Sequence, residues 1–373
     1  MRLDVIRSIW PWLFLLSMSV FFEVWARLAY DTSFLFNLFN IQSILTFAAA
    51  PLLLGIGVTF VIIAGGIDLS IGFAMGFAAV VFATITSSLG GHDPLFALSI
   101  GVIATMLIVM VPGMINGWLI AGLHIPPFIG TLGMYGVARG LGFIVADGVT
   151  VPVNNPILFQ LGTTKIFGLI PVPVLITAIV VLIAHFVLSQ TRFGQYTYAI
   201  GGNREAALRA GINVKRHTLL LYMISAGFAG LAGLIYTARF SAGAAQAGEP
   251  LLLDSIAAVF IGGASFFGGS GKIFGTVIGA LVIAVIQFGL VFVDVEPFWQ
   301  FLAVGVVIIV AVFVDQSRTR VSNGGNRLAV STEAACRINL PELVIDGGNG
   351  RCDQHRCPGP PRQPNERCRR GTA

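Results

Sequence analysis

Long uncharged stretches alternate with short charged breaks along this chain. Eight stretches contain no Asp, Glu, Lys or Arg, namely 32–67, 69–92, 94–138, 166–191, 218–238, 255–271, 273–293 and 297–314. A helix needs about 20 apolar residues to cross the hydrocarbon core of a bilayer. Helices also satisfy their own backbone hydrogen bonds where water is absent. Because the apolar runs are continuous and do not alternate residue by residue, they predict membrane-spanning helices.

The pattern predicts an all-α, polytopic membrane protein with about ten transmembrane helices. The predicted spans are 9–29, 42–63, 69–89, 95–121, 126–146, 171–189, 218–238, 253–269, 273–293 and 297–314. Two of them are irregular, because 126–146 contains Arg139 and several glycines, and 253–269 is short and ends in GGASFFGGSGK. We expect these two to be broken or re-entrant segments, which are tolerated where protein or water covers the backbone.

Composition supports this class and divides the chain into two parts. Of the 373 residues, 56% are hydrophobic and 10% are charged, against about 25% charged in soluble domains. Residues 1–320 form the predicted transmembrane domain. Residues 321–373 contain all four cysteines and many Arg, Pro and Gly residues, and they are too poor in apolar periodicity to form a core. This segment is predicted to be a disordered cytoplasmic tail of unknown role.

Positive charges indicate the orientation of the predicted spans. With ten spans, one side of the membrane receives most basic residues outside the tail, namely Arg2, Arg7, Arg192, Arg204, Arg209, Lys215, Arg216, Lys272, Arg318 and Arg320. The other side receives Arg27, Lys165 and Arg239. Basic loops stay in the cytoplasm. The asymmetry therefore predicts cytoplasmic termini, a cytoplasmic segment 190–217 and an outer loop at 147–170.

The cytoplasmic segment 201–217 reads GGNREAALRAGINVKRH and predicts a short helix between two apolar spans. Asn203 can cap the helix, and Glu205 in the first turn suits the helix dipole. Ala206 and Ala207 favour helix, and Gly211 can end it in a left-handed conformation. An ordinary basic inner loop with some helix is the alternative.

This segment resembles a known motif. Glu205-Ala206-Ala207 followed after three residues by Gly211 is similar to the E-A-A-x-x-x-G pattern of permease subunits in ATP-binding cassette (ABC) importers. The resemblance implies that the short helix docks on a separate cytoplasmic ATPase. That partner would bind the ATP, so this chain would carry no cofactor and would not itself be an enzyme.

Two further segments narrow the resemblance to one branch, over about residues 40–315. VIIAGGIDLSIG at 61–72 and LDSIAAVFIGGASFFGGSGKIFGTVIGALVI at 253–283 resemble two signatures of the ribose, xylose, arabinose and galactose permeases. The resemblance implies import of a monosaccharide or related polyol across the inner membrane. It also implies a periplasmic or secreted sugar-binding protein and a second permease chain, in a homo- or heterodimer. One departure is Leu252, where the family usually has Glu.

Two acidic residues in these signatures are candidate site residues. Asp68 follows two glycines at the end of an apolar run, and Asp254 immediately precedes another. A carboxylate at membrane depth is costly and by default functional, whereas Asp can also cap a helix. We therefore assign Asp68 and Asp254 to the translocation pathway or to helix caps. Glu23 and Arg27, spaced i,i+4, predict a local ion pair.

Other classes of function have weaker support. GGSGKI at 268–273 resembles a phosphate loop, but Ile273 replaces the Ser or Thr that the motif requires. A secondary transporter or channel would need inverted repeats and ion-relaying charges within its spans. A membrane subunit of an enzyme complex would need cofactor ligands there. The spacing of Cys352, His355 and Cys357 matches no zinc template, and we expect neither a metal nor a nucleic acid partner.

Overall fold

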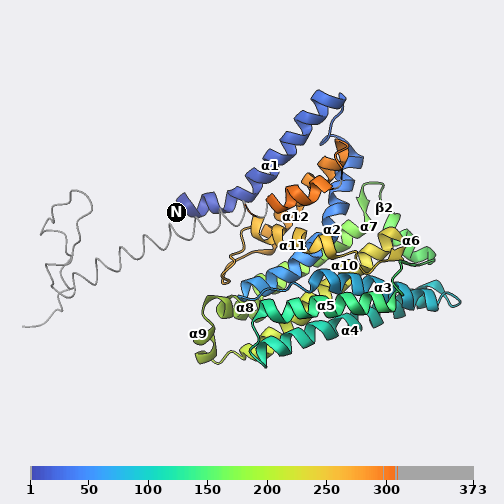
Figure 1. Ribbon diagram of the computed structural model, residues 1–373. Helices are drawn as coiled ribbons and strands as arrows, with labels where there is room; N and C mark the ends of the chain where they lie inside the picture. Colours follow the sequence, from blue (N-terminus) through green and yellow to red (C-terminus); the bar gives the residue numbers. More distant parts are fainter. Residues whose placement is uncertain (1, 297, 307–308, 310–373) are drawn as a thin grey trace, which may run out of the picture. The chain divides into compact units, whose positions relative to one another are not determined.

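The protein is described here from a computed structural model, which covers residues 2–296, 298–306 and 309 (Figure 1). The helices are α1 (Arg2–Tyr30), α2 (Leu38–Ile63), α3 (Ile71–Ser88), α4 (Pro94–Ala121), α5 (Pro127–Val145), α6 (Pro156–Thr163), α7 (Val172–Gln190), α8 (Arg192–Gly202), α9 (Arg204–Arg209), α10 (Val214–Phe240), α11 (Glu249–Ile261) and α12 (Ile273–Phe292). The strands are β1 (Val151–Pro152), β2 (Lys165–Ile166), β3 (Ile170–Pro171) and β4 (Ala242–Gly243).

Eight of these helices are long and apolar enough to cross a membrane, within the part of the chain that the structure describes. They are α1 from Trp10 onward, α2, α3, α4, α5, α7, α10 and α12. The all-α, polytopic membrane class is therefore confirmed. Residues 297, 307–308 and 310–314 of the predicted span 297–314, and the whole predicted tail 321–373, lie outside the described residues, so both stay predictions.

The two irregular spans have different outcomes. Helix α5 runs unbroken, so the expected break in 126–146 is wrong. The side of α5 that carries Gly133, Gly136 and Gly140 meets no neighbouring atom, so these glycines do not interrupt the helix. In contrast, α11 has only 13 residues and the chain is not helical again until Ile273. This confirms the expected break in 253–269.

Helix α10 packs against α2, α3 and α4. Small residues allow the close approach, because a Cβ added at Gly113 of α4 would lie 2.6 Å from the Ala226 Cβ of α10. At Gly117, an added Cβ would lie 2.6 Å from the Leu219 Cα. Membrane helices associate closely through such small-residue faces. Helix α10 thus packs against three of the long helices along its length.

The predicted outer loop at 147–170 is folded and attached to the bundle, at the end opposite α8 and α9 (Figure 1). Strand β1 pairs antiparallel with β4, just after α10, and β2 and β3 form a hairpin. The Lys165 Nζ donates a hydrogen bond of 2.6 Å to the Gln42 Oε1 of α2, and the Gln42 amide donates to the Gly168 and Leu169 carbonyls. These contacts hold the hairpin on α2.

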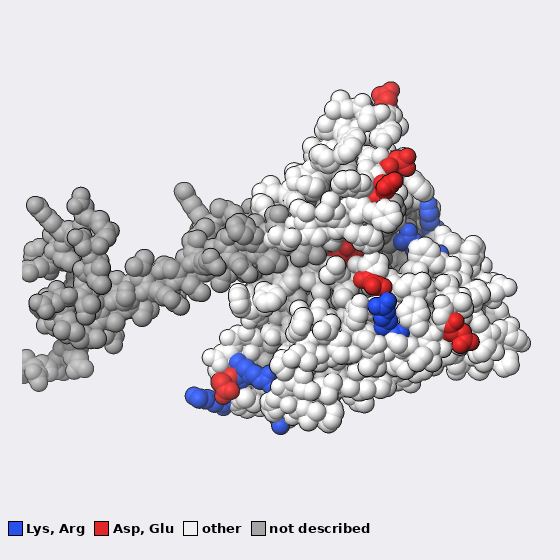
Figure 2. Space-filling view, viewed as in Figure 1, with Lys and Arg blue, Asp and Glu red and all other residues white. Residues whose placement is uncertain are grey.

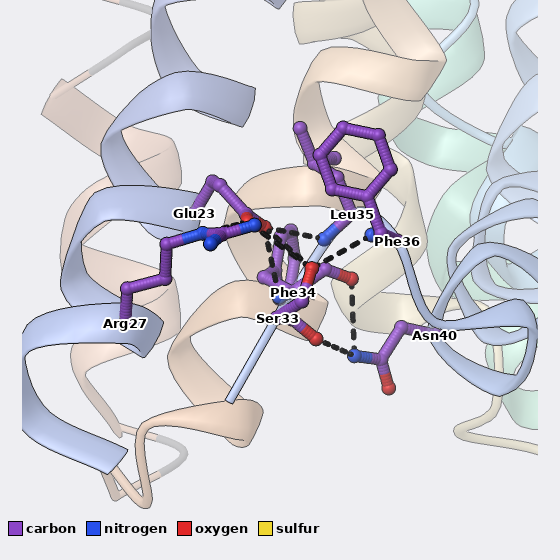
Figure 3. A network of polar contacts seen from close by, with 7 residues as sticks. All are labelled: Glu23, Arg27, Ser33, Phe34, Leu35, Phe36 and Asn40. Carbon is purple, nitrogen blue, oxygen red and sulfur yellow. Dashed lines mark hydrogen bonds and ion pairs between the residues drawn. The ribbon is translucent and has the colours of Figure 1, made fainter. Parts of the chain in front are cut away.

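Helix α1 is joined to the bundle through Glu23 (Figure 3). The predicted ion pair is present, with 2.6 Å between the Arg27 Nε and a Glu23 carboxylate oxygen. Glu23 also accepts hydrogen bonds from the backbone N–H groups of Phe34 and Leu35, at 2.9 and 2.8 Å, and from the Ser33 hydroxyl. The carboxylate therefore accepts hydrogen bonds from the backbone N–H groups of the turn that leads into α2. The i,i+4 spacing of Glu23 and Arg27 did not predict this role.

Candidate coupling segment and membrane site

The helix predicted at 203–211 is α9, and both of its ends are capped as expected. The Asn203 Oδ1 accepts a hydrogen bond of 3.0 Å from the Ala206 N–H. At the other end, Gly211 has φ +81°, the Gly211 N–H donates to the Leu208 carbonyl and the Ile212 N–H donates to the Ala207 carbonyl. This pair of bonds is a Schellman motif, in which glycine is favoured because it has no Cβ. The local structure thus follows from the sequence.

Most of α9 is available to a partner. Ala207 is buried against Ile200 and Val214, whereas Glu205, Ala206 and Leu208 are exposed. Figure 2 shows basic and acidic side chains gathered at the corner that α9 occupies in Figure 1. The helix is therefore anchored by one alanine and presents its other faces to the surroundings.

The sequence analysis missed α8, the 11-residue helix that carries α9. Gly201, near the end of α8, lies against the Ile63 carbonyl at the end of α2, and the Gly269 N–H donates a 2.8 Å hydrogen bond to that same carbonyl. An added Cβ at Gly268 would lie 2.9 Å from the Gly65 Cα. We call the contact of Ile63, Gly65, Gly201, Gly268 and Gly269 the glycine junction.

The glycine junction brings together the three sequence motifs. Gly65 belongs to the first signature, Gly268 to the second, and Gly201 precedes the capped helix α9. The Tyr198 hydroxyl of α8 adds a 2.7 Å hydrogen bond to the Gly271 carbonyl, and burial raises the pKa of the Tyr198 phenol. The paired glycines in each motif were the signal for this contact, but spacing along one chain could not show that they meet.

Asp68 lies in the link between α2 and α3, where it is buried. Its carboxylate accepts hydrogen bonds from the Ser70 N–H at 3.0 Å, the Ser70 hydroxyl at 2.6 Å and the Ser225 hydroxyl of α10 at 2.7 Å. The Asn116 amide of α4 donates to the Ser70 Oγ at 2.9 Å. Asp68 therefore joins the link to α10 and, through Ser70, to α4.

Neither aspartate immediately precedes a helix, although the Asp68 carboxylate accepts the Ser70 N–H just ahead of α3. The residue that precedes α3 is Ser70, not Asp68. Asp254 lies within α11 and so cannot cap its start, and the Gln287 amide of α12 donates a 2.7 Å hydrogen bond to its carboxylate. The two carboxylates have different hydrogen-bond partners, and Asp254 lines a cavity of about 870 Å³. The assignment of Asp68 and Asp254 to the translocation pathway or to helix caps stays a prediction.

No metal site was expected, and the described residues contain no group of three or more His, Cys, Asp or Glu side chains placed to hold one. The segment with Cys352, His355 and Cys357 lies outside the described residues.

Comparison with known proteins shows the class of the chain. Residues 40–312 match the family described as "Branched-chain amino acid transport system / permease component". The D-allose transport system permease protein of Escherichia coli is 39% identical over 279 residues, covering 74% of this chain and 83% of the relative. The ribose import permease protein of Bacillus subtilis is 38% identical, covering 75% and 85%. The galactose/methyl galactoside import permease protein of Haemophilus influenzae is 34% identical, covering 77% and 89%.

No solved structure matches the chain. The family match covers more than half of the chain, and several relatives named as sugar permeases exceed 30% identity. The protein is thus a multi-pass transport permease. It belongs to the permease family of ABC importers that contains the monosaccharide permeases, as the three motifs predicted.

Proposed function

We propose that the chain is the membrane-spanning permease subunit of an ABC importer for a monosaccharide or related small polyol. The observation that carries the proposal is the identity of 39% to an allose permease and 38% to a ribose permease, each over about three quarters of the chain. The subunit acts in the inner membrane and is not an enzyme. A separate cytoplasmic ATPase hydrolyses ATP, a periplasmic or secreted binding protein delivers the sugar, and a second permease chain completes the pathway.

The coupling to ATP hydrolysis runs through α9. Its exposed faces, with Glu205 in the first turn, supply a docking surface. A displacement of α9 is passed to α8, because a single residue, Asn203, separates the two helices. The glycine junction then passes it to the end of α2 and to the segment before α12. Backbone-to-backbone contacts transmit such a displacement well, since they contain no flexible side chain to absorb it.

Asp68 acts in this mechanism as a positioning residue for the α2–α3 link. Its three hydrogen bonds reach Ser70 and Ser225, and they leave the carboxylate satisfied while it is buried. Hydrogen bonds to a charged group are worth about 1.5–3 kcal/mol each, so the link and α10 move as one unit. This assignment favours positioning over direct sugar contact for Asp68.

One observation favours a second substrate class. The family is described by the transport of branched-chain amino acids, whereas the similar relatives described above are named for sugars. The test is uptake of labelled D-allose, D-ribose, D-galactose and L-leucine by proteoliposomes that contain the permease, its ATPase and its binding protein. We expect ATP-dependent uptake of at least one sugar and none of leucine. Uptake of leucine alone, or sugar uptake that persists with a hydrolysis-deficient ATPase, would contradict the proposal.

A further inference from the structure

A cavity whose lining is mostly apolar but includes several polar side chains lies between the end of α10, α11, α12, α2 and the helical residues that follow α12. Its volume of about 870 Å³ falls within the range of about 300–1,000 Å³ that is typical of small-molecule sites. We propose that this cavity is the site at which the permease holds one sugar molecule during transport. This inference rests on the proposed function and adds the place and the residues of sugar recognition.

The cavity offers both donors and acceptors of hydrogen bonds. Asp254 is buried and bonded to Gln287, while Gln246 and Gln300 line the same space. An amide side chain donates through its NH₂ group and accepts through its oxygen. A sugar hydroxyl also donates one hydrogen bond and accepts others. Three amides and a carboxylate around one cavity therefore match a polyhydroxylated ligand.

Arg239 supplies further donors to the cavity. Its guanidinium lies over the rings of Phe47 and Phe240, at 4.7 and 5.1 Å from their centroids. Within residues 2–296, 298–306 and 309, Arg239 forms no ion pair, although Glu249 and Asp254 line the same cavity. The ring contacts hold the group in place and leave its N–H groups for a ligand.

The charges and rings of the cavity favour a neutral ring molecule. Arg239, Glu249 and Asp254 place charges of both signs around the cavity, so an ion of a single sign meets a like charge there. A zwitterion such as leucine would not, and the labelling experiment below therefore includes it beside the sugars. The aromatic side chains of Phe47, Phe240 and Phe301 can pack against the apolar C–H face of a sugar ring while the polar groups bind its hydroxyls. A lipid chain suits this cavity less well because of its charged and amide side chains. A second hollow, along α1, suits a lipid chain better, because Ser17 is the only residue with a hydroxyl, amide or charged group in its lining.

The first experiment compares two arginines that have similar ring contacts. Arg239→Gln alters the cavity, whereas Arg139→Gln alters a guanidinium that lies 5.2 Å from the Phe73 ring, outside the cavity. Sugar uptake and ATP hydrolysis are measured in the same proteoliposomes with the binding protein and the ATPase. We expect Arg239→Gln to lower the number of sugars transported per ATP about tenfold, as the loss of one good hydrogen bond does. Arg139→Gln should leave this ratio unchanged.

The second experiment does not depend on transport activity. In a background with the four native cysteines replaced by serine, Thr46→Cys places a thiol at the cavity, and Ser99→Cys places one on the exposed side of α4. A saturating transported sugar, among D-allose, D-ribose and D-galactose, should slow maleimide labelling of Thr46→Cys about tenfold, since an occupied site excludes the reagent. Labelling of Ser99→Cys should not change.

The outcomes separate the two proposals. If the unaltered transporter imports a sugar, but Arg239→Gln behaves as Arg139→Gln does and Thr46→Cys is not protected, the cavity is not the sugar site and the proposed function stands. If the unaltered transporter imports no sugar, the proposed function itself fails. Protection of Thr46→Cys by L-leucine and by none of the sugars would overturn the sugar assignment of the cavity.

Discussion

The glycine junction makes a sharp prediction about two neighbouring glycines. Gly201 and Gly202 both belong to the end of α8, yet their surroundings differ. A methyl group at Gly201 would lie 2.7 Å from the Gly269 nitrogen and 2.8 Å from the Ile63 carbonyl carbon, whereas one at Gly202 would meet nothing within 4 Å. We therefore expect Gly201→Ala to disturb the junction and Gly202→Ala to leave it intact.

The magnitude follows from these distances. The methyl group would lie closer still to the Ile63 carbonyl oxygen. Because non-bonded carbon atoms pack at about 3.5–4.0 Å, α8 must move by more than about 1 Å from its partners to admit the methyl group. Overpacking of this kind costs about 1–3 kcal/mol, and the hydrogen bond from Gly269 to the Ile63 carbonyl contributes about 0.5–1.5 kcal/mol. Replacing a helical glycine returns up to about 1 kcal/mol. The net destabilisation for Gly201→Ala is thus about 0.5–4.5 kcal/mol, while Gly202→Ala is neutral or slightly stabilising.

The assay combines stability with coupling. Thermal unfolding of the detergent-purified permease should show a lower Tm for Gly201→Ala than for Gly202→Ala. In proteoliposomes, Gly201→Ala should reduce sugar uptake while the permease still captures the ATPase, because the exposed face of α9 is unchanged. Both quantities are normalised to the amount of permease in the membrane.

One result would refute this reasoning. If Gly201→Ala and Gly202→Ala have the same Tm and the same uptake, the contact between α8, α2 and the second signature carries neither stability nor coupling. A loss of ATPase capture by Gly201→Ala would instead assign the effect to the docking surface.

Two further predictions concern charged groups on other elements. Glu205→Lys reverses the charge in the first turn of α9, where the helix dipole favours an anion, and should weaken capture of the ATPase, with Glu205→Gln intermediate. Equal capture by all three proteins would show that Glu205 does not take part in binding the ATPase. Glu23→Gln removes the charge that accepts the backbone N–H groups of Phe34 and Leu35, bonds worth about 1.5–3 kcal/mol each when charged, and should lower the Tm while ATPase capture stays normal. An unchanged Tm would mean that the turn after α1 is held by other contacts.

Much of the fold follows from local sequence. Continuous apolar runs predict the spanning helices, because the bilayer fixes their length. The caps of α9 could also be predicted, since Asn203 and Gly211 act on backbone groups a few residues away. The expected break in α5 is wrong because periodicity does not show what each helix face contacts. A Cβ added at Gly133, Gly136 or Gly140 would meet nothing within 4 Å, whereas one at Gly142 would contact Ala245.

The candidate site was less predictable because its contacts join distant segments. Asp68 and Ser225 are 157 positions apart, and Asp254 and Gln287 come from different helices. The sequence showed that Asp68 and Asp254 would be costly at membrane depth. Their partners, Ser225 and Gln287, are uncharged and gave no such signal. Helix α8 was missed because its Gly, Thr and Tyr residues have modest helix propensity, and its packing on α2 supplies the stability.

The length of α10 has a consequence for how this family diversifies. Its 27 residues, at 1.5 Å each, separate Val214 near the coupling segment from Arg239 at the cavity by roughly 40 Å. Substitutions more than about 10 Å apart and without shared partners usually act independently. If the cavity binds the sugar and α9 binds the ATPase, as proposed above, substitutions near Arg239 would change which sugar is bound and leave attachment of the ATPase unchanged. Permeases for different sugars could then share the same coupling to their ATPases.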